Sequence, residues 1–201
     1  MCAMASAALV ERVEDIAKGA ALMTGTTLRR RFIDGTADVV TNRVLEEAFY
    51  KNFSEIPLPT YTDEELEFSE KIFATYEKDG LPGMACHFDP AIAKTVDELT
   101  NGNTKAQNDF LMPYFHSEVT LPGSTDVGDV SWQTPAVQVY TACEAAGSPG
   151  HSWQNVSVGK SSIGHKGMLF AAKVMACTAL DLFENPDLLE KARAEFEKRT
   201  K

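Results

Sequence analysis

The stretch SIGHKGMLFAAKVMACTALDLF, residues 162–183, decides how this chain folds. Its apolar residues recur at helical spacing on two stripes instead of one. One stripe holds Ile163, Phe170, Val174 and Cys177, and the other holds Leu169, Ala176, Leu180 and Phe183. Lys173 and Asp181 interrupt the run, which is too polar and too short to cross a hydrocarbon layer about 30 Å thick. The pattern predicts a buried helix that is covered on more than one side.

Further helices are predicted on both sides of this stretch. Asn185 is a good cap and Pro186 suits the first helical position, so a closing helix follows with Leu189, Ala192 and Phe196 on its buried side. Thr62 and Glu65 have the spacing of a capping box, which opens a helix that continues to Tyr76. Another helix is expected over residues 42–53, whereas residues 89–108 give only weak helix and loop signals.

Alternation of apolar residues predicts strands over residues 130–132 and 137–141, and the β-favouring composition of residues 26–33 predicts a further strand there. An amphipathic helix precedes the first strand over residues 9–23. One helix and one strand cannot bury their own apolar faces, so this amino-terminal part needs something to pack against. Strands separated by helices favour an α/β fold or a mixed α+β layer architecture.

Composition and charge exclude several classes of protein. The 201 residues carry a formal net charge of −10, which makes nucleic-acid binding improbable because phosphate neutralisation needs clustered basic residues, and the run Arg29–Arg31 is too short to reverse this. No membrane span and no secretory leader is recognised. The four cysteines show neither zinc-ribbon spacing nor the density of a disulfide scaffold. We therefore expect a cytoplasmic protein.

Three glycine-containing segments, residues 123–132, 149–154 and 159–167, form the candidate site. They carry Asp126, Asp129, His151, Lys160 and His165. Carboxylate oxygens and imidazole nitrogens suit Zn, Mn or Co. The spacing alone leaves other interpretations open, since the aspartates could cap turns and the histidines could be ordinary hydrogen-bonded polar residues.

Three other motifs are set aside. Residues 159–161 resemble the end of a phosphate-binding loop, but Gln154 stands where that loop needs a glycine. Cys86 and His87 are adjacent and point in opposite directions on an extended chain, so they do not form a nucleophilic dyad. His116 has aromatic neighbours and is expected to anchor a strand.

Residues 15–26, 122–132 and 149–174 resemble the carboxy-terminal part of the M20 metallopeptidase and amidohydrolase superfamily, most closely its p-aminobenzoyl-glutamate hydrolase branch. The resemblance implies a zinc-type catalytic α/β domain interrupted by a smaller lid domain that also dimerises. By this comparison residues 1–40 are a remnant of the lid domain, a helix plus a strand. Residues 41–201 are the carboxy-terminal segment of the catalytic domain.

The resemblance also implies roles for the candidate residues. His151 lies where the family has its late metal-binding histidine, and Asp126 lies in a Gly-Ser-Thr-Asp segment similar to the family's Gly-Ser-Glu-Asp, as a ligand or an orienting group. His165, Lys160 and Asp129 are candidate substrate contacts. The family's earlier Cys-Gly-His motif and Glu-Glu pair have no match here, so a divalent-metal site for Zn or Mn would be incomplete.

The resulting hypothesis is a fragment or subunit of an M20-like metal-dependent amidohydrolase that cleaves an amide such as aminobenzoyl-glutamate and is weak or inactive alone. Open sheet edges would favour a homo-oligomer or a partner polypeptide that supplies the missing half. The alternative is a non-catalytic dimerisation or interaction module derived from such an enzyme. A small stand-alone metal-binding protein is a third interpretation.

Overall fold

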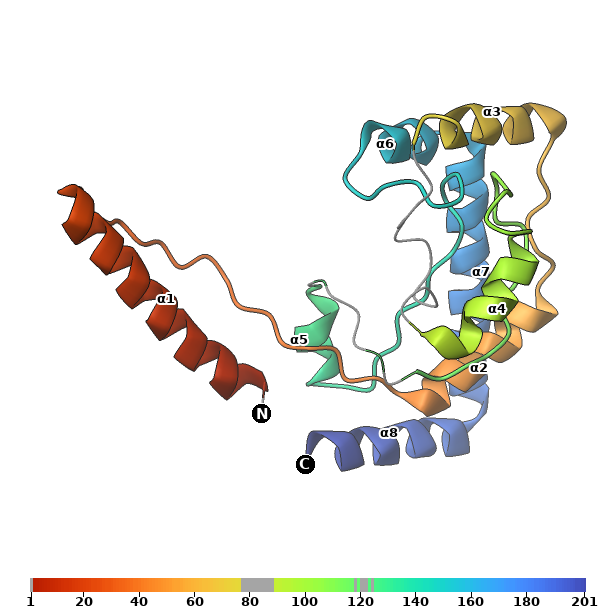
Figure 1. Ribbon diagram of the computed structural model, residues 1–201. Coiled ribbons are helices and arrows are strands. Elements are labelled where there is room, and N and C mark those ends of the chain that lie inside the picture. Colours follow the sequence, from red (N-terminus) through yellow and green to blue (C-terminus); the bar gives the residue numbers. More distant parts are fainter. Residues whose placement is uncertain (1, 77–88, 118, 120–122, 124) are drawn as a thin grey trace.

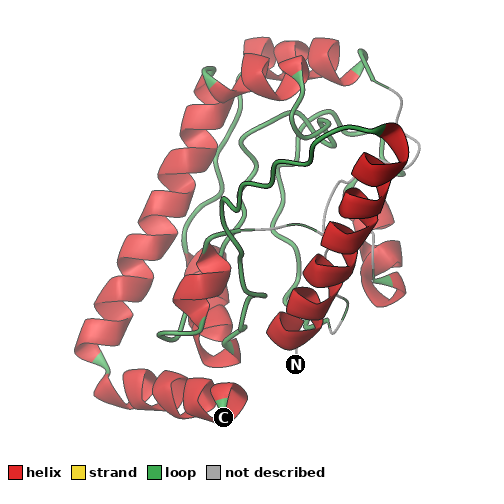
Figure 2. Ribbon diagram, turned by 90° about the vertical axis from the view of Figure 1, so that its left-hand side faces the viewer, coloured by secondary structure: helices red, strands yellow, loops and turns green. Residues whose placement is uncertain are grey.

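A computed structural model describes residues 2–76, 89–117, 119, 123 and 125–201 of the chain. These residues form eight helices and no strand, as Figures 1 and 2 show. The helices are α1 Cys2–Thr24, α2 Arg43–Glu55, α3 Asp63–Phe73, α4 Pro90–Leu99, α5 Val127–Ser131, α6 Trp153–Gly159, α7 Ser162–Glu184 and α8 Pro186–Thr200. The predicted α/β class, and its α+β alternative, are therefore wrong for the described part of the chain.

None of the three predicted strands forms, because the described residues offer no neighbouring strand for it to pair with. Strand preference mainly reflects packing within a sheet. Residues 26–33 are exposed and belong to no regular element. Residues 130 and 131 end the short helix α5, and Trp132 follows as its cap. Residues 137–141 have no ladder, and Thr141 instead donates its hydroxyl proton to the Gly167 carbonyl at 3.1 Å. His116, predicted to anchor a strand, also lies in a segment without regular structure.

The helix boundaries with local cap signals are confirmed. The Thr62 hydroxyl accepts from the Glu65 amide at 3.3 Å and the Glu65 carboxylate accepts from the Thr62 amide at 2.7 Å, which completes the capping box of α3. Asn42 caps α2 and Asn185 caps α8. These starts depend on contacts within four residues, so the local sequence is enough to specify them. Helix α3 nevertheless ends at Phe73, before the predicted Tyr76.

The core lies along one side of α7, which packs against α2, α6 and α8. Ile163 and Val174 of the first predicted stripe are fully buried, and Phe170 stacks at a tilt against Phe53 of α2 with ring centroids 5.5 Å apart. Asn52 of α2 donates its side-chain amide to Thr178 at 3.1 Å, and to the Asp181 carboxylate on the same helix α7. The second stripe faces solvent, so the described residues cover α7 on one side and leave its other side open.

The structure is unusually open. The chain exposes 13908 Å², whereas a compact monomer of 22.0 kDa would expose about 9,300 Å². Part of the excess comes from α1, which stands apart from the other helices in Figure 1 and packs extensively against none of those described. The predicted helix over residues 9–23 is confirmed, but its apolar side is uncovered, with Ile16 71% and Met23 89% exposed. No helix of the described residues is long and apolar enough to cross a membrane. The boundary near residue 40 stays a prediction.

Candidate functional site

The segment predicted to carry the carboxylates clamps the chain where it enters the helical core. The Asp129 carboxylate accepts from the Ala37 amide at 3.0 Å. The Ser131 hydroxyl accepts from the Val40 amide at 2.8 Å, and the Trp132 indole donates to the Asp38 carbonyl at 2.9 Å. We call Gly128, Asp129, Ser131 and Trp132 the α5 clamp. It holds residues 37–40 by three hydrogen bonds that span more than ninety residues of sequence.

Gly128 allows the α5 clamp to contact the backbone of residues 37–40 directly. A Cβ atom at this position would lie 2.0 Å from the Ala37 carbonyl oxygen, a distance that no side chain tolerates. The glycine therefore allows two backbones to meet directly, which is one of the uses expected of the glycines in this segment. The clamp gives Asp129 a structural role through its Oδ1 atom, so a substrate contact would have to use Oδ2.

Asp126 and His151 lie on different elements. Asp126 precedes α5, is exposed, and makes no cap hydrogen bond with its side chain. His151 is exposed just before α6 and has a backbone φ of 57°, a left-handed conformation that is uncommon for residues other than glycine. Figure 1 shows α5 and α6 well separated. The structure thus presents both side chains to solvent and does not join them in one cluster.

Lys160 and His165 flank the corner between α6 and α7. Lys160 follows the last residue of α6, and His165 lies in the first turn of α7, and both are exposed. A Cβ atom on Gly164 would come within 2.8 Å of the Gly159 carbonyl, so the corner depends on a close backbone approach. Both candidate contacts are therefore held on a rigid corner beside solvent.

The fit of these residues to a metal ion is poor within the described part of the chain. No three His, Cys, Asp or Glu side chains there come together in a group that could hold a metal ion. A catalytic zinc site ordinarily takes three protein ligands. His151 and Asp126 therefore do not form a complete site by themselves, and the pair Cys86 and His87 lies outside the described residues.

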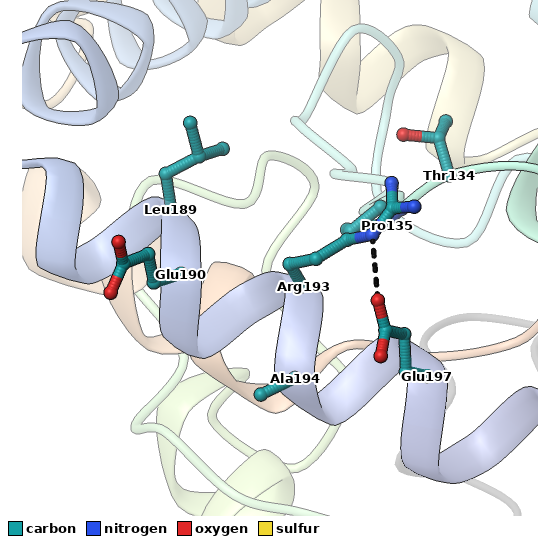
Figure 3. A pocket seen from close by; sticks show the side chains of 7 residues that line it. All are labelled: Thr134, Pro135, Leu189, Glu190, Arg193, Ala194 and Glu197. Carbon is teal, nitrogen blue, oxygen red and sulfur yellow. Dashed lines mark hydrogen bonds and ion pairs between the residues drawn. The ribbon is translucent and has the colours of Figure 1, made fainter.

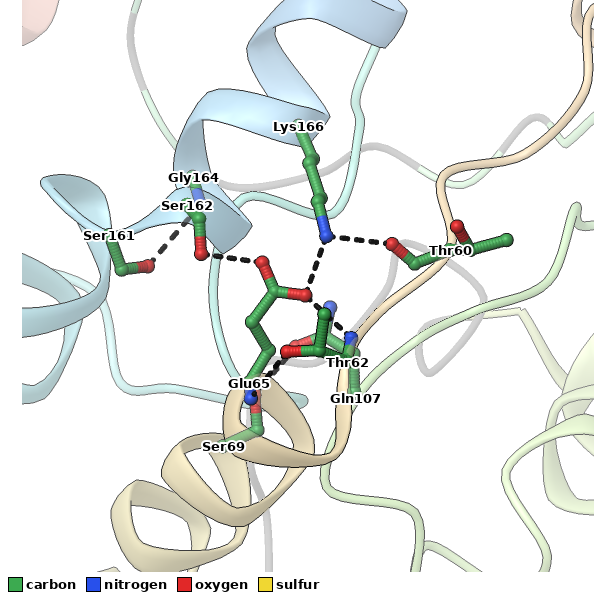
Figure 4. Close-up of polar contacts among 9 residues, drawn as sticks. All are labelled: Thr60, Thr62, Glu65, Ser69, Gln107, Ser161, Ser162, Gly164 and Lys166. Carbon is green, nitrogen blue, oxygen red and sulfur yellow. Dashed lines mark hydrogen bonds and ion pairs between the residues drawn. The ribbon is translucent and has the colours of Figure 1, made fainter.

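A polar cluster at the start of α7, which the sequence did not reveal, is the most tightly connected group of charges (Figure 4). The buried Glu65 carboxylate accepts from Ser162 on Oε1 at 2.5 Å and from Lys166 on Oε2 at 2.5 Å. Lys166 also donates to the Thr60 carbonyl at 2.8 Å and lies 5.5 Å from the centre of the Tyr61 ring. The cluster joins the start of α3 to the start of α7.

The charge state of this cluster makes it structural. Hydrogen bonds from Lys166, then Ser162, then the Thr62 amide lower the pKa of Glu65 from 4.5 to about 2. The carboxylate is thus ionised at neutral pH and both of its oxygens are occupied. The carboxylate accepts three hydrogen bonds from protein donors, which fix its position between α3 and α7. The capping box was the only local signal, because Lys166 lies 101 residues away from Glu65.

A groove of about 540 Å³ runs between α8 and the segment after α5 (Figure 3). It is lined by Thr134, Pro135, Leu189, Glu190, Arg193, Ala194 and Glu197. Arg193 lies over the Phe196 ring and donates to Glu197 at 3.2 Å, so its charge is already compensated. None of the predicted site residues lines this groove.

Comparison with known proteins relates the chain to a hydrolase subunit. It is 40% identical over 198 residues to a subunit of p-aminobenzoyl-glutamate hydrolase from Escherichia coli (strain K12). The alignment covers 96% of this chain and 40% of that protein, so the chain spans about two fifths of the length of its relative. Identity at this level over nearly the whole chain shows that the two are related. No protein-family model and no solved structure matches the chain.

Proposed function

We propose that this chain is a fragment or subunit of an M20-like, metal-dependent amidohydrolase that cleaves an amide such as p-aminobenzoyl-glutamate in the cytoplasm. The 40% identity to a subunit of p-aminobenzoyl-glutamate hydrolase is the observation that carries the proposal. The chain corresponds to only 40% of that relative, so the activity needs further polypeptide. Alone, the chain is weak or inactive.

The metal site in this proposal is shared between polypeptides. His151 serves as a ligand of Zn or Mn and Asp126 as a ligand or an orienting group. The remaining ligands and the general base come from outside this chain, in keeping with the poor fit of the described residues alone. The exposure of both side chains leaves them accessible to such a partner.

The substrate contacts in this proposal come from the corner between α6 and α7. Lys160 and His165 are exposed there, and an ammonium or imidazolium group would attract the carboxylates of a glutamate moiety. Asp129 is the third candidate, through the oxygen that the α5 clamp does not use. The partner is a second polypeptide or further copies of this chain.

A non-catalytic interaction module is the second candidate function. It is favoured by the lack of any three-residue metal group in the described residues and by the large apolar surface that they leave open. Such a module would bind another polypeptide without contributing to an amide-cleaving site.

Hydrolysis of p-aminobenzoyl-glutamate separates the two candidates. The chain is assayed alone and after co-expression with the part of the E. coli relative that lies outside the aligned region, with Zn or Mn added. We expect activity only in the second case, and its loss in His151→Ala. His116→Ala is the matched control and should retain the activity. A co-expressed complex that binds the metal but leaves the amide intact would favour the interaction module.

A further inference from the structure

Helix α7 presents a second apolar face that nothing in the described chain covers. We call it the outer face of α7: Met168, Leu169, Ala172, Met175, Ala176, Ala179, Leu180 and Phe183. Its large side chains are 54% to 83% exposed, although they lie on the opposite side of the same helix from the fully buried Val174. The outer face follows helical spacing along most of the 23 residues of the helix.

The polarity of α7 does not suit a helix that faces water. Lys173 is the one exposed charged residue between positions 168 and 183, because Asp181 is half-buried and accepts a hydrogen bond from Asn52 of α2. A surface helix of a globular protein carries an apolar stripe on one side only, whereas a helix that is apolar on both sides is buried between two layers. The outer face is therefore built to be covered.

Size argues against a second copy of this chain as the cover. Residues 168–183 rise about 24 Å along the helix, so a face near 10 Å wide offers roughly 240 Å² per copy, well under the roughly 800 Å² per partner of a stable interface. Each copy also carries a net charge of −10, so pairing would bring like charges together. A polypeptide large enough to extend beyond the face does not meet the objection from size.

We infer that the outer face of α7 is the docking surface for the polypeptide that corresponds to the remaining 60% of the relative's length, outside the 40% aligned with this chain. This inference rests on the proposed function, which requires that polypeptide. The inference adds to the proposed function the surface that the partner binds. The partner covers α7 from the side opposite α2, and α7 becomes the middle layer of the assembled domain.

Methionine oxidation tests the docking surface without any substitution. The chain is treated with hydrogen peroxide, alone and after co-expression and co-purification with the part of the E. coli relative outside the aligned region. Met168 and Met175 are 56% and 54% exposed in the chain, and Met23 of α1 is 89% exposed. We expect Met168 and Met175 to oxidise at least fivefold more slowly in the complex, while Met23 keeps its rate.

Substitution provides the second test. Leu180→Asp places a charge on the outer face and should weaken the complex at least tenfold, as measured by titration. Leu22→Asp is the matched control on α1, where Leu22 is 84% exposed, and should change the affinity less than twofold. Because Leu180 is 57% exposed, the variant chain should fold alone with an unchanged circular dichroism spectrum.

The outcomes decide which polypeptide covers the outer face of α7. Failure to co-purify, equal oxidation rates of Met168 in the chain and the complex, or unchanged affinity of Leu180→Asp would each overturn the inference. Concentration-dependent protection of Met168 in the chain alone would overturn it in favour of a second copy. A complex with protected methionines but no amidase activity would uphold the docking surface and defeat the proposed function. Amidase activity without protection of the methionines would uphold the proposed function and defeat the docking surface.

Discussion

Residues 1–40 and residues 41–201 both form helices that their apolar periodicity predicts, yet only the second region builds a core. Helix α1 forms as its amphipathic pattern predicts, but its apolar side faces solvent. Helices α2, α7 and α8 form equally well and also bury Leu45, Val174 and Ala192 against one another. The difference teaches that periodicity specifies a helix, whereas burial requires a partner surface within reach of the chain.

The two regions are joined at one place. The α5 clamp holds residues 37–40, and nothing comparable ties α1 to the core in the described residues. Within the amino-terminal region, Arg30 pairs with Glu14, so the extended segment follows α1 rather than the core. Substitutions in the core, at the clamp and in α1 should therefore have successively smaller effects on stability.

The largest effect is expected for Glu65→Ala. The substitution leaves Lys166 and Ser162 without their shared acceptor beside the core, and breaking such a charged network typically costs about 3 kcal/mol. The free energy of unfolding from urea titration measures the loss. Glu67→Ala is the control, since Glu67 is exposed and forms an ion pair with Lys71 of the same helix. Equal losses in the two variants would mean that the cluster does not brace the core.

The same cluster gives the core a pH dependence. The pKa of Glu65 is lowered in the folded chain from 4.5 to about 2, so the stabilisation is fully present above the unfolded value and is lost as the pH falls from about 5 towards 2. The difference in unfolding free energy between wild type and Glu65→Gln should therefore shrink over this range. A difference that stays constant down to pH 3 would contradict the lowered pKa.

Gly167→Ala should destabilise the core by about 2 kcal/mol through overpacking. A Cβ atom there would lie 2.3 Å from the Ala142 carbonyl oxygen and 2.7 Å from Cys143 Sγ, and the backbone oxygen cannot move aside cheaply. Thermal unfolding measures the effect. Gly159→Ala is the matched control, because nothing lies within 4 Å of its Cβ position. Equal unfolding temperatures of the two variants would show that residues 142–143 do not pack tightly on α7.

The sequence predicts five of the eight described helices, α1, α2, α3, α7 and α8, but it gives only weak signals for α4, assigns a strand where α5 ends, misses α6 and predicts the wrong fold class. The caps at Asn42, Thr62 and Asn185 act within four residues, so they can be recognised locally. A strand exists only through a neighbour that is distant in sequence, and residues 26–33 and 137–141 have no such neighbour in the described chain. The second stripe of α7 predicted a second cover, whereas in the described chain that stripe faces solvent.

Close backbone approaches were predictable from the glycines of the candidate segments, whereas the partners of the polar side chains were not. The glycine-rich segments do contain close backbone contacts, at Gly128 and Gly164. The bond from the Ala37 amide to Asp129, and the pairing of Lys166 with Glu65, join residues about a hundred positions apart and leave no local signal. The roles of His151 and Lys160 stay predictions.

At the junction of the two regions, Gly128→Ala should release the clamp at a cost of about 1.5 kcal/mol, within the range for overpacked sites. Its Cβ atom would meet the Ala37 carbonyl oxygen at 2.0 Å, so residues 37–40 must move away. Hydrogen exchange measures this directly: the amides of Ala37 and Val40 lose Asp129 and Ser131 as acceptors and should exchange about tenfold faster. Gly150→Ala, with open space at its Cβ position, should leave both rates unchanged.

The smallest effect on the core is expected for Gly19→Ala in the middle of α1. Nothing lies within 4 Å of the Cβ position, so alanine fits, and the exchange should stabilise the helix itself by up to about 1 kcal/mol. Because α1 packs extensively against no other described helix, that gain should stay within α1. Far-ultraviolet circular dichroism should show slightly more helix, while the unfolding midpoint followed by the fluorescence of Trp132 and Trp153, which both lie in residues 41–201, stays the same. A midpoint that rises with the helicity would show that residues 1–40 are coupled to the core, which would break the contrast between the two regions.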